Sequence, residues 1–103
     1  MTILTSDNFK SEIGAHEGLA VIDLYADWCG PCKMLAPILA ELEEEYPEVK
    51  FCKANVDEQT GLASLFHVES IPFVAFVKGD TVCDVSVGYV PKQKLAEIID
   101  GLK

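Results

Sequence analysis

The chain has 103 residues, of which 50% are hydrophobic, so it has the size of one ordinary domain and can bury a core without staples or metals. Its 17 acidic and 8 basic side chains give a formal net charge of -9, and such a surface repels nucleic-acid phosphates and anionic lipids. We therefore expect no nucleic-acid and no membrane partner; the charge serves either solubility alone or the steering of basic partners.

The first ten residues, MTILTSDNFK, lack the basic start, the long apolar stretch and the cleavage site of a signal peptide. No apolar run approaches the ~18 residues that a membrane span requires. The four cysteines do not show the dense pattern of a small secreted scaffold, and they favour a reducing compartment. From these features we expect a single domain over residues 1–103, cytoplasmic and monomeric.

The first half of the chain predicts a helix, a buried strand and a second helix. Cap-type residues stand ahead of Phe9 and Ile13, which are spaced four apart and predict a short helix. Residues 19–26, LAVIDLYA, form a nearly continuous apolar run, typical of a strand that is buried on both faces. The third element is an amphipathic helix that ends at Pro47, and its apolar side consists of Leu35, Ile38, Leu39, Leu42 and Tyr46.

The second half predicts a strand at 49–56, a shorter helix at 58–66 and a hairpin of strands 73–77 and 81–87. The last helix is entered at Pro91, and its apolar stripe consists of Leu95, Ile98, Ile99 and Leu102. This order of elements requires a right-handed crossover between parallel strands, followed by an antiparallel edge. We therefore predict an α/β fold, a mixed sheet with helices on both faces.

Cys29 and Cys32, in the stretch WCGPC, lie between the predicted strand at 19–26 and the helix that follows it. Open α/β sheets place reactive groups beyond this carboxyl end of their central strands. The spacing allows the two α-carbons to approach within the ~4.4 to 6.8 Å that a disulfide requires. The helix N-terminus favours a thiolate on the first cysteine, so we expect Cys29 to attack a disulfide and Cys32 to resolve the mixed disulfide.

Three functions of this cysteine pair compete. A structural disulfide that closes so short a loop restricts the unfolded chain little. A zinc or iron–sulfur centre normally requires four ligands, and the chain has no second CxxC motif or other ligand spacing. The remaining candidate ligands are Cys52, Cys83, His16 and His67. Reversible redox exchange is the interpretation that we favour, and we expect no metal and no cofactor.

The motif WCGPC, the aspartate six residues before Cys29, KMLAP after Cys32 and SIPF at 70–73 resemble the thioredoxin family, and the resemblance spans essentially the whole chain. It implies the thioredoxin fold, a central mixed sheet of about five strands flanked by about four helices. It also implies a protein disulfide reductase that works through a reversible Cys29–Cys32 disulfide. The implied partners are disulfide-containing proteins and a thioredoxin reductase, which restores the dithiol.

By this resemblance, Asp23 is buried beneath the cysteines and exchanges a proton with Cys32 through water. Burial would raise the pKa of such a carboxyl group toward the working pH. Lys53 is implied to lie near Asp23, where its charge opposes this rise. The residues alone also allow a solvated strand-end position for Asp23, and a Lys53 that extends from a strand into water.

Pro72 corresponds to a cis-proline that faces the cysteine pair and leaves the backbone of Ile71 free to bind an extended substrate. A trans proline at a strand start is the commoner alternative. With Gly30 and Pro31, Pro72 is expected to tune the redox chemistry. The implied apolar docking patch consists of Trp28, Gly30, Pro31, Ile71, Pro72, Val87 and Gly88. For Trp28, packing in the core is the alternative.

Three positions depart from the commonest bacterial pattern of the family. Tyr25 stands where tryptophan is frequent, Phe73 where threonine usually follows the proline, and His67 where glycine often ends a helix. We expect His67 at a helix end, because histidine tolerates the left-handed conformation better than most residues. Cys52 and Cys83 fall in predicted strands and are expected to be buried and inert, with regulatory oxidation as the alternative.

Two rival functions remain. A disulfide donor or isomerase would gain from a histidine between the cysteines, which makes the bridge more oxidising; Pro31 argues against this function. A binding module would use the same surface to hold a partner without redox turnover. Replacement of both cysteines by serine separates the binding module from a reductase, because only the module would retain its partner's function.

Overall fold

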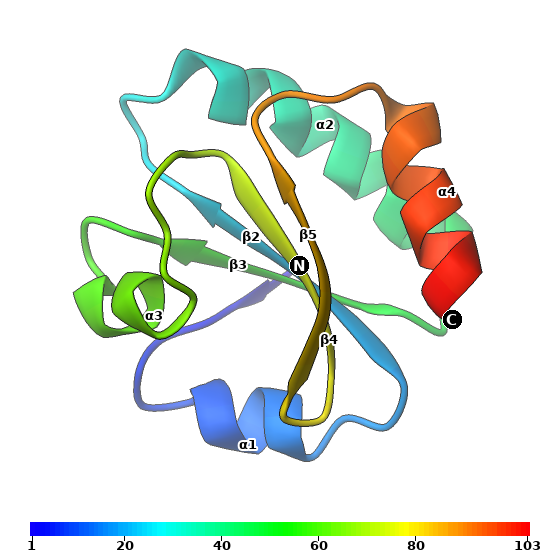
Figure 1. Ribbon diagram of the computed structural model, residues 1–103, viewed down its shortest axis with the longest axis horizontal. Coiled ribbons are helices and arrows are strands. Elements are labelled where there is room, and N and C mark those ends of the chain that lie inside the picture. Colours follow the sequence, from blue (N-terminus) through cyan, green and yellow to red (C-terminus); the bar gives the residue numbers. More distant parts are fainter.

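In the computed structural model, which describes residues 1–103, one central sheet lies between two layers of helices (Figure 1). The strands are β1 (Thr2–Ile3), β2 (Leu19–Tyr25), β3 (Lys50–Asn55), β4 (Phe73–Lys78) and β5 (Thr81–Val87). The helices are α1 (Phe9–Gly14), α2 (Gly30–Glu45), α3 (Thr60–Leu65) and α4 (Lys92–Leu102). None of these helices has the length and hydrophobicity that a membrane-spanning helix needs. The elements confirm the predicted α/β fold.

The strand order is β1-β3-β2-β4-β5, so β2 lies in the centre of the sheet. β1 and β2 run parallel to β3, whereas β4 runs antiparallel to both β2 and β5. The register places Asp23 of β2 between Lys53 of β3 and Val74 of β4. The parallel crossover and the antiparallel edge are as predicted. The residue pattern did not predict β1, because two residues are too few to show an alternation.

β2 is apolar along its length because each face of the sheet carries its own core. Ile22 and Leu24 belong to a core shared with α1 and α3. Leu19 and Val21 belong to a second core, which is shared with α2 and α4. Successive side chains of a strand point to opposite faces, so a strand that helices cover on both sides has a continuous apolar run. Burial of each such large side chain stabilises the fold by roughly 1.5 to 3 kcal/mol.

The two longer helices begin and end close to the predicted residues. α2 begins directly after Cys29, which is its N-cap residue, and it ends at Glu45, ahead of Pro47. Its buried face includes the predicted residues Leu35, Leu39 and Leu42. α4 begins one residue later than expected, because Pro91 has an extended backbone (ψ 155°) and is the N-cap residue and not the first helical residue.

β5 is an edge strand of the sheet, and its exposure corrects the expectation of a buried Cys83. Cys83 is exposed, and Ser86 is the one buried residue of β5. The register shifts here: Val82 and Asp84 pair with successive residues of β4, which leaves Cys83 without a partner residue. Cys52, in the interior strand β3, is buried as expected, and burial raises the pKa of its thiol to about 11. The Cys52 thiol therefore stays protonated at neutral pH.

Candidate active site

Cys29 and Cys32 form a disulfide at the N-terminus of α2, beyond the carboxyl end of β2. Their α-carbons are 5.2 Å apart, and each residue is only 4% exposed. The Sγ atom of Cys29 accepts a hydrogen bond from the backbone N–H of Cys32 at 3.2 Å. The unpaired N–H groups and the positive end of the helix dipole therefore favour a thiolate on Cys29 once the bridge is reduced.

Exposed apolar side chains occur next to Cys29, at Trp28, and at the end of β5, at Val87. Trp28 is 72% exposed and Val87 is 53% exposed, so the alternative of a core-packed Trp28 is wrong. The Nε1–H group of Trp28 donates a hydrogen bond to Oδ2 of Asp57 at 2.8 Å, which restrains the indole ring. Gly30 and Pro31, at the start of α2, are also exposed. An apolar surface beside a reactive bond is typical of a docking site.

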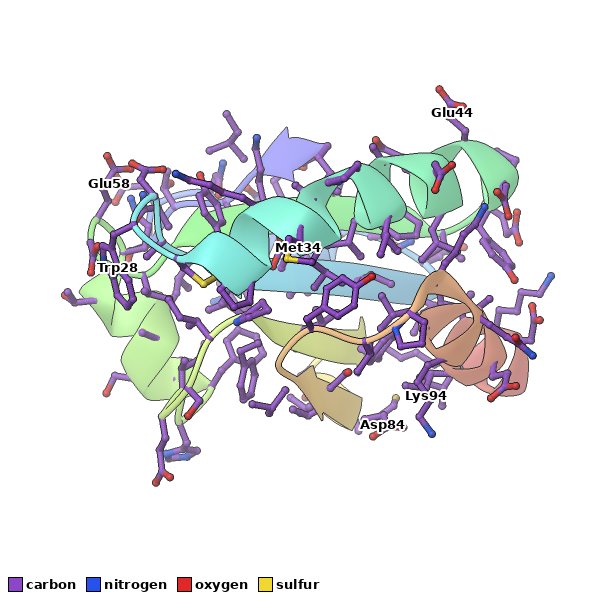
Figure 2. All side chains as sticks on the ribbon, turned by 90° about the horizontal axis from the view of Figure 1, so that it is seen from above. Trp28, Met34, Glu44, Glu58, Asp84 and Lys94 are labelled. Atoms are coloured by element: carbon purple, nitrogen blue, oxygen red, sulfur yellow. A yellow bond between two sulfur atoms is a disulfide. The ribbon has the colours of Figure 1, made fainter.

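The structure shows two further exposed apolar side chains, and one polar partner of Trp28, that the sequence did not predict. Met34 is 60% exposed and lies on the first turns of α2, two residues after Cys32; Figure 2 shows it nearer the middle of the molecule than Trp28. Tyr89, which follows Gly88, is 45% exposed. An apolar residue on the polar side of an amphipathic helix was the available signal for Met34. No signal pointed to Asp57, because its contact with Trp28 joins segments that are 29 residues apart.

The loop before β4 contacts the cysteine cluster through Ile71. The Ile71–Pro72 peptide bond is cis, and Ile71 packs against the small cluster that contains both cysteines. No hydrogen bond within the chain uses the backbone N–H or C=O group of Ile71. The N–H group of Gly88, whose φ of 87° favours glycine, donates to the carbonyl of Pro72 at 2.8 Å. The loop is thus tied to the end of β5 while the Ile71 backbone stays available.

Asp23 lies in β2 and is only 6% exposed. Its Oδ1 atom is buried and has no hydrogen-bond partner. Burial raises the pKa of this carboxyl from 3.8 to about 6, and the charge of Lys53, its register neighbour on β3, opposes the rise. The solvated strand-end position is therefore wrong for Asp23. The half-buried Lys53 lies where its charge acts on the carboxyl.

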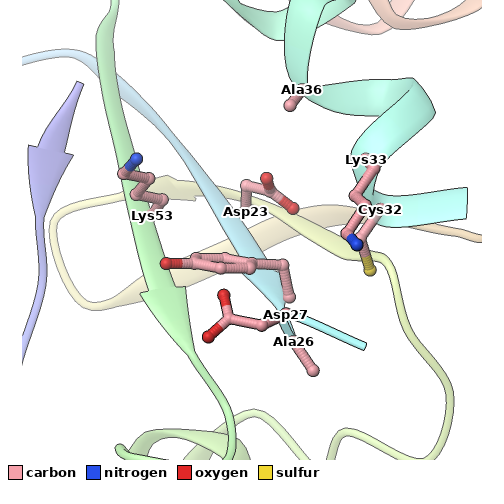
Figure 3. A pocket seen from close by; sticks show the side chains of 8 residues that line it. Asp23, Ala26, Asp27, Cys32, Lys33, Ala36 and Lys53 are labelled. Atoms are coloured by element: carbon pink, nitrogen blue, oxygen red, sulfur yellow. The ribbon is translucent and has the colours of Figure 1, made fainter. Parts of the chain in front are cut away.

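A cavity of about 160 Å³ is lined by both Asp23 and Cys32. In Figure 3 the Asp23 carboxyl lies between Lys53 on β3 and Cys32 on α2. The cavity is lined by Asp23, Tyr25, Ala26, Asp27, Cys32, Lys33, Ala36 and Lys53. It exceeds the roughly 10 to 15 Å³ that one water occupies, and its lining is partly charged. Water in this cavity can link the Asp23 carboxyl to the sulfur of Cys32.

The three departures from the family pattern have distinct surroundings. Tyr25 is half-buried and lines the cavity of Asp23, and burial is the main cause that raises the pKa of its hydroxyl group. Phe73 is buried in the core beneath α1 and α3. His67 follows α3 with a φ of 55°, in the left-handed conformation that was expected at a helix end. No three His, Cys, Asp or Glu side chains form a group that could hold a metal ion.

The chain is similar to known proteins in sequence and in fold. The family model Thioredoxin matches residues 1–101. The chain is 40% identical over 97 residues to the thioredoxin of Bacillus subtilis strain 168, covering 93% of this chain and 91% of the relative. It is 41% identical over 98 residues to the thioredoxin of Staphylococcus haemolyticus, covering 94% and 92%. The structure of Fasciola hepatica thioredoxin matches with a TM-score of 0.93 at 35% identity, and the match covers 100% of both chains. With the disulfide in the motif WCGPC, these similarities show that the chain belongs to the thioredoxin family and is a dithiol–disulfide oxidoreductase.

Proposed function

We propose that the protein passes two electrons to disulfides of other proteins and that a thioredoxin reductase then restores its dithiol. The observation that carries this proposal is the Cys29–Cys32 bridge at the N-terminus of α2. Both cysteines belong to one short segment of a packed helix start, so the bridge can open and close without a rearrangement of the fold. The electrons reside on the two sulfurs, and no cofactor is required.

In the first step, the Cys29 thiolate attacks one sulfur of the substrate disulfide. The substrate S–S bond breaks, its other sulfur leaves and takes up a proton, and Cys29 is joined to the substrate in a mixed disulfide. The helix N-terminus favours Cys29 for this step because it stabilises the negative sulfur before attack.

In the second step, the Cys32 thiol gives its proton through water to the Asp23 carboxylate and attacks the sulfur of Cys29. The bond between Cys29 and the substrate breaks, and the substrate sulfur leaves as a thiolate, which takes up a proton to give a second thiol. A carboxyl with a pKa of about 6 is mostly ionised at pH 7 and accepts this proton without a large cost. We assign Lys53 the role of keeping that carboxyl ionised, since its charge lowers the pKa that burial raises.

We assign substrate binding to the surface around the bridge. The unpaired backbone of Ile71 can pair with an extended substrate segment, which brings the substrate disulfide to Cys29. Trp28, Val87 and Gly88 complete the apolar surface on which the segment rests. We assign redox tuning to Gly30, Pro31 and Pro72. These residues carry no positive charge, whereas a histidine between the cysteines would stabilise the thiolate and make the bridge more oxidising.

We further propose that residues 1–103 act as one monomeric domain in a reducing compartment such as the cytoplasm. All five strands join one sheet, and both helix layers pack against it. Cys52 and Cys83 are free thiols, and Cys83 is exposed. An exposed thiol persists where thiols are kept reduced, which supports this location.

The two cysteines and one control cysteine provide the test. The protein is mixed with a disulfide-containing protein such as insulin, a thioredoxin reductase and NADPH, and NADPH consumption is followed. We expect Cys29→Ser to abolish turnover, Cys32→Ser to accumulate the mixed disulfide without turnover, and Cys83→Ser to retain the full rate. A double serine variant that still supported its partner's function would indicate a binding clamp instead.

The direction of electron flow is tested by the reduction potential of the bridge. Trp28 lies next to Cys29, so its fluorescence can report the state of the bridge across buffers of defined thiol–disulfide ratio. Each ~30 mV is a tenfold change in equilibrium for this two-electron couple. A potential well below that of glutathione supports a reductase, whereas one well above it would make the protein a disulfide donor.

A further inference from the structure

We propose that a groove beside Trp28 selects substrates that carry a lysine or arginine next to the cysteine attacked by Cys29. This inference rests on the function proposed above and adds a class of preferred substrate. The groove, with a volume of about 270 Å³, lies between the Trp28 side of the cysteine pair and the loop that leads into Pro72. Half-buried Val56, Val68 and Ile71 line it, and Trp28 and Glu69 at its edge are exposed.

The groove lies where residues next to a bound substrate cysteine must pass. Trp28 directly precedes Cys29, and Ile71, which also lines the groove, packs against the cysteine cluster. The backbone of Ile71 is also the group proposed to pair with the substrate. A side chain within one or two residues of the attacked sulfur can therefore enter the groove.

The charges around the groove are negative and have no cation partner. Glu69 is the one charged residue that lines the groove. Three further acids are exposed nearby: Asp27 directly precedes Trp28, and Asp57 and Glu58 follow the end of β3. Figure 2 shows Glu58 beside Trp28 at this end of the molecule. The four ion pairs of the chain use other acids, namely Glu12, Glu43, Glu45 and Glu48.

The lysines nearest to the site lie elsewhere. Lys33 and Lys53 line the cavity of Asp23 and not the groove, and the chain contains no arginine. An incoming basic side chain therefore meets an unscreened negative edge. The overall charge of -9 has the same sign and adds to the attraction at long range.

Lysine and arginine fit the chemistry of this groove better than other side chains. Their aliphatic stems can pack along Val68 and the face of the Trp28 indole, while the cationic head reaches Glu69. A purely apolar side chain would use the walls and leave Glu69 without a partner. An acidic side chain would be repelled. The preference acts on formation of the mixed disulfide, because the groove is filled when Cys29 attacks.

The test uses protein with Cys32→Ser, which stops at the mixed disulfide, and with Cys83→Ser, which removes the exposed competing thiol. The substrates are short peptides whose single cysteine is joined by a disulfide to thionitrobenzoate, with Lys, Gln or Glu on either side of that cysteine. Attack by Cys29 on the peptide sulfur breaks the S–S bond and releases coloured thionitrobenzoate. Mass spectrometry verifies that the peptide is attached to Cys29.

We expect the lysine peptide to react about fivefold or more faster than the glutamate peptide at low salt, with the glutamine peptide between them, and 0.5 M NaCl to shrink the difference. Glu69→Gln should reduce this preference and Glu69→Lys should remove or reverse it. The control is Glu44→Lys, which makes the same change in net charge at the exposed far end of α2 (Figure 2). It should preserve the preference.

The possible failures are separable. If all three peptides react with Cys29 at equal rates, the selection is wrong and the proposed reductase function stands. An equal loss of preference in Glu44→Lys and Glu69→Lys would show that net charge, and not the groove, is responsible, which also overturns the inference. If no peptide reacts with Cys29, the proposed function fails and the inference fails with it.

Discussion

Asp23 lies in the centre of the sheet with a carboxyl oxygen that has no hydrogen-bond partner. The proposed proton transfer needs a carboxyl that changes its charge near neutral pH, and burial supplies this by raising its pKa to about 6. The same burial destabilises the folded protein whenever the carboxyl is ionised. At this position a group suited to catalysis therefore reduces stability, as is common at active sites.

The effect of Asp23 on stability depends on pH in a defined direction. Below pH 3.8 the carboxyl is protonated in the folded and unfolded chains, so its raised pKa has no effect. Between pH 3.8 and about 6 the folded chain binds more protons, so stability falls as pH rises. Above this window the full loss is about 3 kcal/mol.

Asp23→Asn should therefore gain about 2.5 kcal/mol of stability, relative to the original protein, between pH 4 and pH 8, because about 0.5 kcal/mol of the full loss is already present at pH 4. Burial of the asparagine amide costs the same free energy at both pH values, so this cost cancels when the stability differences at the two pH values are compared. Urea unfolding of the oxidised protein at several pH values measures this change. Asp7→Asn, at an exposed position, is the control and should show less than about 0.5 kcal/mol. A pH-independent difference for Asp23→Asn would contradict the raised pKa.

At the scale of elements, the end of β5 positions the loop that faces the cysteines. The N–H group of Gly88 bonds to the carbonyl of Pro72, and this requires a φ of 87° directly after the strand. A Cβ atom at this position would meet no atom within 4 Å, so the cost of a side chain comes from the backbone conformation alone.

Gly88→Ala should therefore destabilise the protein by about 1 to 2 kcal/mol. The matched control is Gly101→Ala in α4, where a Cβ atom also has no neighbour within 4 Å and the backbone is helical. That change should stabilise the protein by up to about 1 kcal/mol, since alanine favours a helix. Thermal unfolding of both variants measures the two signs, and a neutral Gly88→Ala would show that the backbone relaxes there.

At the scale of the whole molecule, repulsion among acidic side chains opposes compaction. The net charge is -9, while the four ion pairs involve side chains that are partly exposed and contribute little each. Salt weakens both the repulsion among the acidic side chains and the attraction within the ion pairs. Because the repulsion involves more charges, its loss outweighs the loss of the ion pairs.

NaCl added from 0.01 to 0.2 M should therefore raise the stability of the protein, by about 1 kcal/mol. Calorimetric melting measures this rise. Glu44→Lys changes the net charge from -9 to -7, because one negative charge becomes positive, and it should respond less to salt. A melting temperature that fell with salt would show that the ion pairs outweigh the repulsion.

Local patterns were sufficient for every element except β1 and for the position of the redox pair. A continuous apolar run predicted the central strand β2, because helices cover both faces of the sheet. The helical spacing after Cys32 predicted α2 and, with it, the helix N-terminus at Cys29. The predicted burial of Asp23 and the left-handed His67 were found as well, although their roles came from the family resemblance.

Only the tertiary structure decided which residues meet across the chain. β1 forms because β3 offers it an edge, and Cys83 is exposed because β5 is an edge strand, whereas Cys52 in β3 is buried. The contact of Asp57 with Trp28 and the groove that contains Glu69 also join segments that are distant in sequence. A sequence by itself determines what each short segment can form, because periodicity and capping act within a few residues. Exposure, cavities and neighbouring charges depend on packing between segments, which no local pattern records.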